Sequence, residues 1–120
     1  MSNQSLDSIL DLFSKKQFQE ALNAIEDVVL DKSKEALLFN IRGACYAGLN
    51  NLKIAKENYE KAITLNPEYS KAYFNLAGVL HELEDFDASI KSYQKALLIE
   101  PDYAEAHNNL GNVYRESSEI

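Results

Sequence analysis

The chain has 120 residues, which is enough for one domain of ordinary size. Hydrophobic residues make up 46% and charged residues 26%, a balance typical of a folded protein and richer in apolar residues than a disordered chain. The net charge of -7 argues against binding to nucleic acid or to an anionic membrane, because phosphate contacts need clustered basic residues. Here Lys15-Lys16 is the only adjacent basic pair in the sequence.

The compartment can be inferred from cysteine usage and from the opening residues. One cysteine, Cys45, rules out a disulfide framework within the chain and a zinc site built on cysteines. The first residues lack the basic start and the apolar run of a signal peptide, since Asp7 and Asp11 interrupt them. No stretch approaches the ~18 apolar residues that suggest a membrane span. We therefore expect a reducing, cytoplasmic setting and no membrane contact.

No group of residues in the sequence indicates a metal site, a cofactor site or a catalytic centre. His81 and His107 have no partner at ligand spacing. The acidic run at 82–87 lacks the glycine and the spacing of a calcium loop. Cys45 lies beside Tyr46 in a pattern typical of a small core residue, which disfavours a nucleophile. We expect no catalytic residues, no metal and no cofactor.

The chain matches itself at one fixed shift, which is the mark of a repeat architecture. The shift places Tyr59 on Tyr93 and Pro67 on Pro101, and the register holds over the whole chain without an insertion. The repeats are 2–35, 36–69, 70–103 and a partial copy at 104–120.

Each repeat reads as two helices, because apolar residues recur on one face in each half. Pro67 and Pro101 each end a second helix, since the residue before proline is pushed out of helical geometry. Asp85 or Asp87 is a candidate N-cap for the helix that follows it. The spacing predicts, in chain order, helices near 5–14, 18–30, 36–48, 52–65, 70–82, 86–98 and 104–116.

These residues resemble the tetratricopeptide repeat, in which small, aromatic and proline positions recur with the same period. The second repeat carries the pattern at Phe39, Gly43, Tyr46, Ala55, Tyr59, Ala62 and Pro67. The third carries it at Tyr73, Leu76, Ala77, Leu80, Ser89, Tyr93, Ala96 and Pro101, and the partial copy at Leu110, Gly111 and Tyr114. The resemblance covers nearly the whole chain.

The sequence departs from the family pattern at a few positions. Arg42 stands where the family prefers leucine, and we expect its stem to pack while its head reaches solvent. His107 takes an aromatic position. The first copy is degenerate, with Ser5, Ile9 and Ser33 at signature positions. That copy reads as a terminal cap, or else as a merely divergent repeat.

The resemblance implies an all-α fold, a right-handed α-solenoid of about three and a half repeats forming one domain over residues 1–120. In this family the first helices line a concave groove that holds extended or helical segments. Carried onto this sequence, the groove residues are Asn40, Lys71, Phe74, Asn75, Gly78, His81, Asn108, Asn109, Asn112 and Arg115, with Leu37, Ile41, Ala44, Ala47 and Glu105 between them.

The asparagines are the most informative of these residues. Asn75 and Asn109 share one repeat position, and Asn40 lies one position out of register. An amide both donates and accepts, so a ladder of amides can grip the backbone of an extended chain. Alternatively, the asparagines solvate an exposed face or bond to neighbouring helices. Lys71 with Asn75 also resembles part of a clamp that holds a chaperone's C-terminal carboxylate, but apolar residues take other basic positions of that clamp.

The sequence favours a protein–protein interaction module whose partner is a protein or peptide. One alternative is a substrate-recruiting N-terminal segment of a larger enzyme, because 101–116 is similar to repeats of O-linked N-acetylglucosamine transferases and of bacterial sulfotransferases. A second alternative is a self-assembling scaffold. The partial repeat lacks a second helix to cover Leu110, Val113 and Tyr114, so we expect weak self-association there, unless the helix is a cap or the chain continues.

Overall fold

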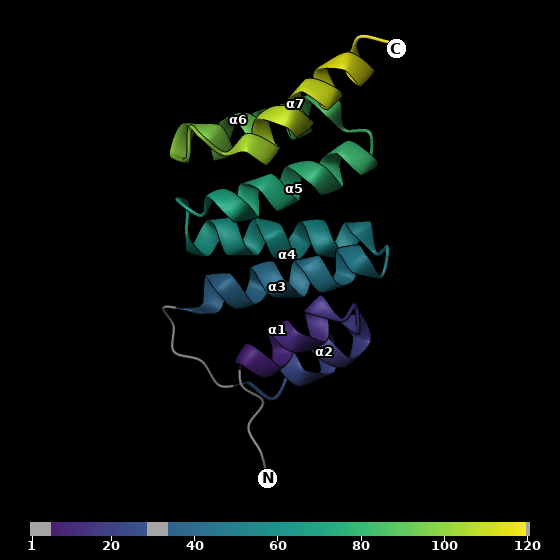
Figure 1. Ribbon diagram of the computed structural model, residues 1–120, viewed down its shortest axis with the longest axis vertical. Helices are drawn as coiled ribbons and strands as arrows, with labels where there is room; N and C mark the ends of the chain where they lie inside the picture. Colours follow the sequence, from purple (N-terminus) through teal and green to yellow (C-terminus); the bar gives the residue numbers. More distant parts are fainter. Residues whose placement is uncertain (1–5, 29–33, 120) are drawn as a thin grey trace.

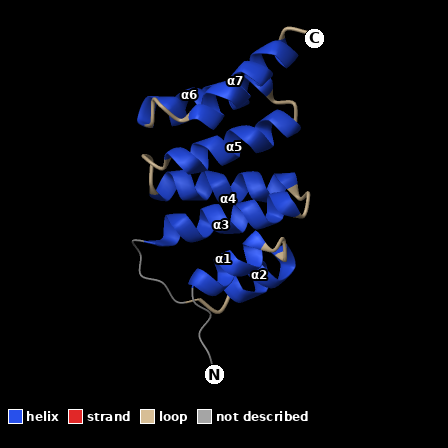
Figure 2. Ribbon diagram, in the orientation of Figure 1, coloured by secondary structure: helices blue, strands red, loops and turns tan. Residues whose placement is uncertain are grey.

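The computed structural model describes residues 6–28 and 34–119, which form seven helices (Figure 1). They are α1 (Leu6–Ser14), α2 (Phe18–Ile25), α3 (Glu35–Gly48), α4 (Leu52–Leu65), α5 (Ser70–Glu82), α6 (Phe86–Ile99) and α7 (Ala104–Ser117). The helices stack along a body of 54 × 26 × 21 Å, with α1 and α2 at one end and α7 at the other. The described residues contain only helices and loops (Figure 2), and none of these helices is long and apolar enough to cross a bilayer.

The helix bounds agree with those predicted, except at the second helix. It was expected to reach residue 30, but α2 ends at Ile25. The amides of Asp27 and Val28 bond to carbonyls three residues back, each at 3.1 Å, and this tighter turn ends the α-helical pattern. Residues 29 and 30, and the repeat positions Ser5 and Ser33, lie outside the described residues.

Of the two N-cap candidates, Asp85 is at the N-cap position, and Asp87 is the second residue of the helix. Asp85 occupies the N-cap of α6, and its side chain makes no capping bond. Its backbone is already engaged, because the Asp85 amide donates to the Leu80 carbonyl at 2.9 Å. That bond belongs to the turn that ends α5, so the backbone geometry here is set by the preceding helix.

Each turn from a first to a second helix has the same backbone geometry. Lys16, Asn50 and Glu84 occupy one repeat position and have φ values of 61°, 61° and 63°. The amide of each donates to a carbonyl three residues back, and the next amide donates to one five residues back. This is the Schellman arrangement that ends helices with a left-handed residue. It folds the second helix of each repeat back against the first.

The helices of a repeat approach closely because small residues lie where they cross. Ala21, Ala55 and Ser89 share one repeat position and are fully buried. Gly43 of α3 faces the ring of Tyr59, and a Cβ at Gly43 would lie 2.7 Å from that ring. The core therefore depends on matched small and large residues, as the sequence pattern indicated.

Candidate functional site

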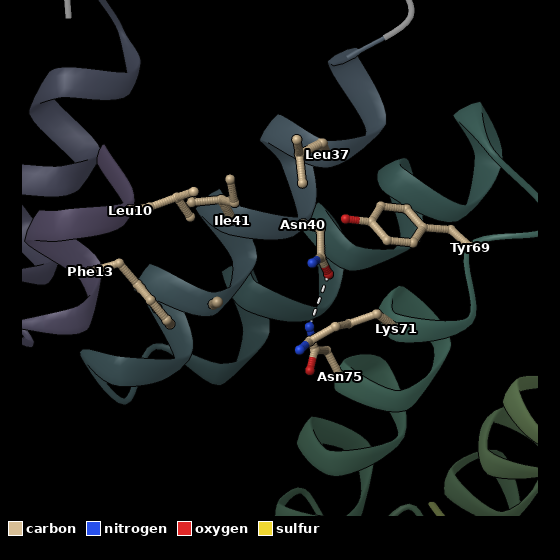
Figure 3. Close-up of a pocket in the computed structure, with 9 residues that line it drawn as sticks. Leu10, Phe13, Leu37, Asn40, Ile41, Tyr69, Lys71 and Asn75 are labelled. Carbon is tan, nitrogen blue, oxygen red and sulfur yellow. Dashed lines mark hydrogen bonds between the residues drawn. The ribbon is translucent and has the colours of Figure 1, made fainter. Parts of the chain in front are cut away.

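A hollow on one side of the stack brings together α1, α3 and the start of α5 (Figure 3). Its volume is about 330 Å³. We call it the amide hollow, and its lining residues are Leu10, Phe13, Leu37, Asn40, Ile41, Ala44, Tyr69, Lys71 and Asn75. Figure 3 shows apolar side chains from α1 and α3 on one side, and Tyr69, Lys71 and Asn75 on the other. An occupant would meet an apolar wall and a polar edge together.

Helical spacing explains why these residues share the hollow. Leu37, Asn40, Ile41 and Ala44 follow one another at i, i+3, i+4 and i+7, so they form one face of α3. Lys71 and Asn75 are four residues apart on α5, so they share the face of that helix that lines the hollow. Both helices are the first of their repeats, and these are the helices from which the sequence predicted a groove.

Two amides meet at the polar edge of the amide hollow. Asn75 donates an Nδ2 hydrogen to Oδ1 of Asn40 at 3.0 Å (Figure 3). Asn40 is buried, and Asn75 is half-buried. Burial raises the pKa of Tyr69, and a side-chain hydrogen bond with Asn40 partly opposes that rise. The bond between the amides leaves Asn75 one further N–H and its Oδ1 for an occupant.

Lys71 supplies the charge of the amide hollow. Its side chain is exposed and runs toward the two amides in Figure 3. Within residues 6–28 and 34–119 it forms no ion pair with a carboxylate. Among the described residues, Lys71 is the one basic residue that lines the hollow, so a single negative group of an occupant would have one cation to meet.

At the next repeat junction an aromatic residue fills the equivalent place. Phe74 is the repeat equivalent of Asn40, and it stacks on Tyr103 with centroids 4.9 Å apart. It also meets the edge of Tyr93 at 5.8 Å. Gly78, another predicted groove residue, is half-buried, and a Cβ there would lie 3.8 Å from the Tyr93 hydroxyl. Phe74 therefore packs within the body of the molecule.

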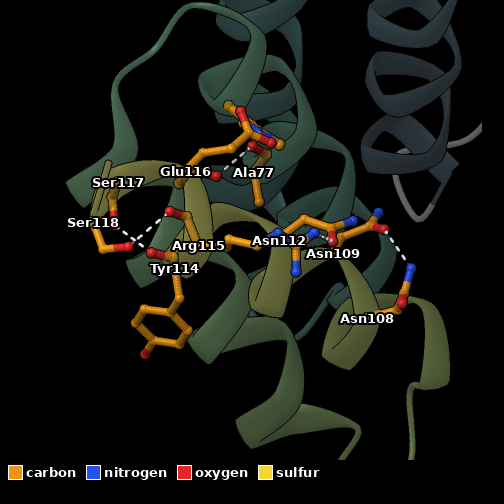
Figure 4. Close-up of polar contacts among 11 residues, drawn as sticks. Ala77, Asn108, Asn109, Asn112, Tyr114, Arg115, Glu116, Ser117 and Ser118 are labelled. Atoms are coloured by element: carbon orange, nitrogen blue, oxygen red, sulfur yellow. Dashed lines mark hydrogen bonds and ion pairs between the residues drawn. The ribbon is translucent and has the colours of Figure 1, made fainter. Parts of the chain in front are cut away.

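The remaining predicted groove residues lie near or on α7, away from the amide hollow. His81 of α5 places Nε2 3.0 Å from Oε2 of Glu116 on α7. Figure 4 shows a row of polar side chains along α7 that bond mainly to one another. Asn108 donates to Asn109 at 3.4 Å, and Arg115 donates to Asn112. These contacts are local to the last helices.

The structure joins Asn75 and Asn109 to different partners. Asn75 bonds to Asn40, whereas Asn109 bonds to the hydroxyl of Tyr93. Burial raises the pKa of Tyr93, and the hydrogen bond with Asn109 partly opposes that rise. Both amides thus bond to side chains of neighbouring helices, and their role as groove residues stays a prediction. Asn40 was expected to contribute to the groove from one position out of register. Among the described residues, Asn40 and Asn75 form the one pair of side-chain amides that joins two repeats, and Asn40 is its buried member.

Sequence reasoning missed three lining residues, although the repeat register contained a signal for two of them. Leu10 and Phe13 stand one full repeat before Ala44 and Ala47, which were both assigned to the groove. They were left out because the first copy was read as a cap. Tyr69 ends the second repeat, and its match with Tyr103 was visible. Nothing in the sequence placed its ring over the hollow.

Comparison with known proteins establishes the family. Protein-family models described as "TPR repeat" or "Tetratricopeptide repeat" match residues 31–69, 58–91 and 77–117. The chain is a tetratricopeptide repeat protein, and its fold is the α-solenoid of about three and a half repeats that the sequence predicted.

Curated relatives are longer proteins. "Heat shock protein sti1 homolog" of Schizosaccharomyces pombe is 29% identical over 77 residues, which is 64% of this chain and 13% of the relative. "Hsp70-Hsp90 organizing protein 1" of Glycine max is 26% identical over 82 residues, or 68% of this chain and 14% of the relative. The chain thus matches about one seventh of the length of these relatives.

Solved structures share the fold at low identity. The first TPR domain of human RPAP3 superposes with a TM-score of 0.87 at 22% identity, covering 94% of this chain and 89% of that one. The first TPR of Spaghetti (RPAP3) bound to the HSP90 peptide SRMEEVD gives 0.85 at 23%, covering 93% and 89%. MamA gives 0.85 at 24%, covering 94% and 66%.

Proposed function

We propose that this chain is a cytoplasmic, non-catalytic binding module that holds an extended segment of a partner polypeptide in the amide hollow. The observation that carries the proposal is the half-buried amide of Asn75, which keeps a donor and an acceptor beside an apolar wall. Amides recognise the peptide backbone, and the wall of Leu10, Phe13 and Ile41 accepts an apolar side chain. The other predicted groove residues on α5 and α7 would extend this surface.

The charge of the amide hollow limits the number of negative groups that the partner segment can carry. The peptide in one related structure, SRMEEVD, has three acidic side chains among its last four residues. The described lining of the amide hollow offers one cation, Lys71, in a chain of net charge -7. Repulsion disfavours a multiply charged tail here. We therefore propose a partner segment with an apolar anchor and no more than one negative group, which binds more tightly than a peptide ending EEVD.

A selection from random peptides tests this proposal. Peptides enriched on the wild-type chain should carry an apolar residue, and Leu10→Glu should raise their Kd about tenfold or more by placing a charge on the apolar wall. The matched control is Leu83→Glu, because Leu83 is 44% exposed and Leu10 is 42% exposed, and Leu83 lies outside the hollow. Equal losses in the two variants would refute the assignment of the site.

A second proposal concerns the open face of α7, which favours weak self-association. A Cβ at Gly111 would meet no heavy atom within 4 Å, although its repeat equivalent Gly43 faces a tyrosine ring. Tyr114 is 48% exposed, whereas its repeat equivalent Leu80 is 4% exposed. A second copy of the chain could cover this face.

A further inference from the structure

A second hollow lies on a different face of α3. It has a volume of about 480 Å³, and we call it the Phe39 hollow. Its lining residues are Glu35, Leu38, Phe39 and Arg42 from α3, and Lys61, Thr64 and Leu65 from the last turns of α4. The α3 residues follow one another at i, i+3, i+4 and i+7, and none of them lines the amide hollow. The two hollows therefore use separate faces of one helix.

Two cations are held over one aromatic ring in the Phe39 hollow. The Arg42 guanidinium carbon lies 5.2 Å from the Phe39 ring centroid, and Lys61 Nζ lies 5.5 Å from it. Within the described part of the chain, neither cation forms an ion pair with a carboxylate. The ring holds both charges near one point, so less side-chain freedom is lost when an anion binds.

The rest of the Phe39 hollow combines apolar and polar side chains, since Leu38 and Leu65 line it together with Glu35 and Thr64. Its lining thus carries two cations and one carboxylate. Leu65 is one of the exposed large hydrophobic residues, and Leu38 and the Phe39 ring are partly buried beside it. An exposed leucine lies here beside two cations that pair with no described carboxylate. This lining suits a ligand that combines an apolar group with negative charge. Arg42 was expected to pack its stem and to extend its head to solvent, and the structure adds that this head lies over the Phe39 ring.

This combination occurs at one repeat. The repeat equivalent of Arg42 is Leu76, which is buried in the core with Tyr59 and Leu80. Lys61 has an equivalent in Lys95, but the arginine has none in the third repeat. A cation pair over a ring is thus a particular feature of the second repeat, and the tetratricopeptide pattern does not require it.

We propose that the Phe39 hollow is a second docking surface, which binds an acidic segment of a partner polypeptide that presents an apolar side chain beside one or two carboxylates. Charge complementarity carries the proposal: the carboxylates pair with Arg42 and Lys61, and the apolar side chain lies against Leu65. Two cations in a chain of net charge -7 are too few for nucleic acid. The proposal does not depend on the amide hollow.

Binding of a short Glu- and Leu-containing peptide tests this inference, with a matched peptide in which Gln replaces each Glu. The Glu peptide should shift backbone amide resonances at Phe39–Arg42 and Lys61–Leu65, and the Gln peptide should bind about tenfold or more weakly. Binding should weaken as salt rises, since the pairs are near the surface. Equal affinity of the two peptides, or no binding of the Glu peptide, would overturn the proposal.

Charge variants locate the site. Arg42→Gln combined with Lys61→Gln should weaken binding of the Glu peptide about tenfold or more. Lys91→Gln combined with Lys95→Gln on α6 changes the net charge equally and should leave the affinity unchanged. The exposed single variant Lys61→Glu, which removes no buried group, should weaken binding even if the double variant folds poorly. Equal losses in both double variants, or tighter binding of a DNA oligonucleotide than of the peptide, would contradict the inference.

Discussion

The residues that end the first helices adopt a conformation that their chemistry does not favour. Lys16, Asn50 and Glu84 all have positive φ. Asparagine visits this left-handed region readily, but lysine and glutamate carry a Cβ penalty there of roughly 1 kcal/mol. The hydrogen bonds of the turn hold these residues in place. The same strain recurs at one repeat position because the solenoid geometry needs the same turn in every copy.

Glycine at the third of these turns should stabilise the chain. Glu84→Gly is expected to raise the free energy of unfolding by about 1 kcal/mol, because it removes the Cβ penalty at a φ of 63°. Asn50→Gly should gain less. Urea unfolding monitored by circular dichroism measures both. The control Glu57→Gly, at an exposed position in the middle of α4, should instead lower the free energy of unfolding by about 1 kcal/mol. Lower stability of Glu84→Gly than of the wild type would contradict this account of the turn.

At the scale of helices, the packing of each pair depends on which residue sits at the crossing. Gly43 lets α3 approach the Tyr59 ring on α4, whereas Gly111 on α7 faces open space. The two glycines occupy the same repeat position, yet their surroundings differ because no second helix follows α7 among the described residues. The same residue type thus has a steric role in one helix and none in the other.

Alanine substitutions at these glycines should have effects of opposite sign. Gly43→Ala should lower the free energy of unfolding by about 1–2 kcal/mol, since the methyl group overpacks against a buried ring and the Ala55 carbonyl. Gly111→Ala should raise it by about 0.5–1 kcal/mol through helix propensity alone. Thermal and urea unfolding of the two variants and of the wild type measure these changes in the free energy of unfolding. Higher stability of both variants than of the wild type would show that the crossing tolerates a methyl group.

The helices and their order could be predicted from the sequence, but the shape of the site could not. Periodicity, repeat register and proline positions fix where helices lie, because they act locally. The amide hollow depends on tertiary packing: Asn40 leaves space at one junction, and Phe74 fills the same place at the next. Phe74 and Asn40 have the same helical position, so spacing alone could not tell an open site from a filled one.

At the scale of the whole molecule, the open face of α7 predicts that the apparent molecular mass in solution rises with protein concentration. Light scattering should detect weak self-association of the wild type, and Tyr114→Glu should abolish it by placing a charge on that face. Leu98→Glu is the control, because Leu98 is exposed on α6 and does not belong to α7. A strict monomer at high concentration would refute self-association through α7.

The bond between Asn40 and Asn75 ties the second repeat to the third inside the amide hollow. A ligand that bonds to Asn75 therefore acts on the joint between two repeats, and the affinity of the hollow and the angle between α3 and α5 become thermodynamically linked. The apolar core around Tyr59 and Leu76 joins the same two repeats, so pulling the two ends of the solenoid apart would load this core and the amide bond together. The affinity of the amide hollow for a ligand would therefore depend on tension along the body.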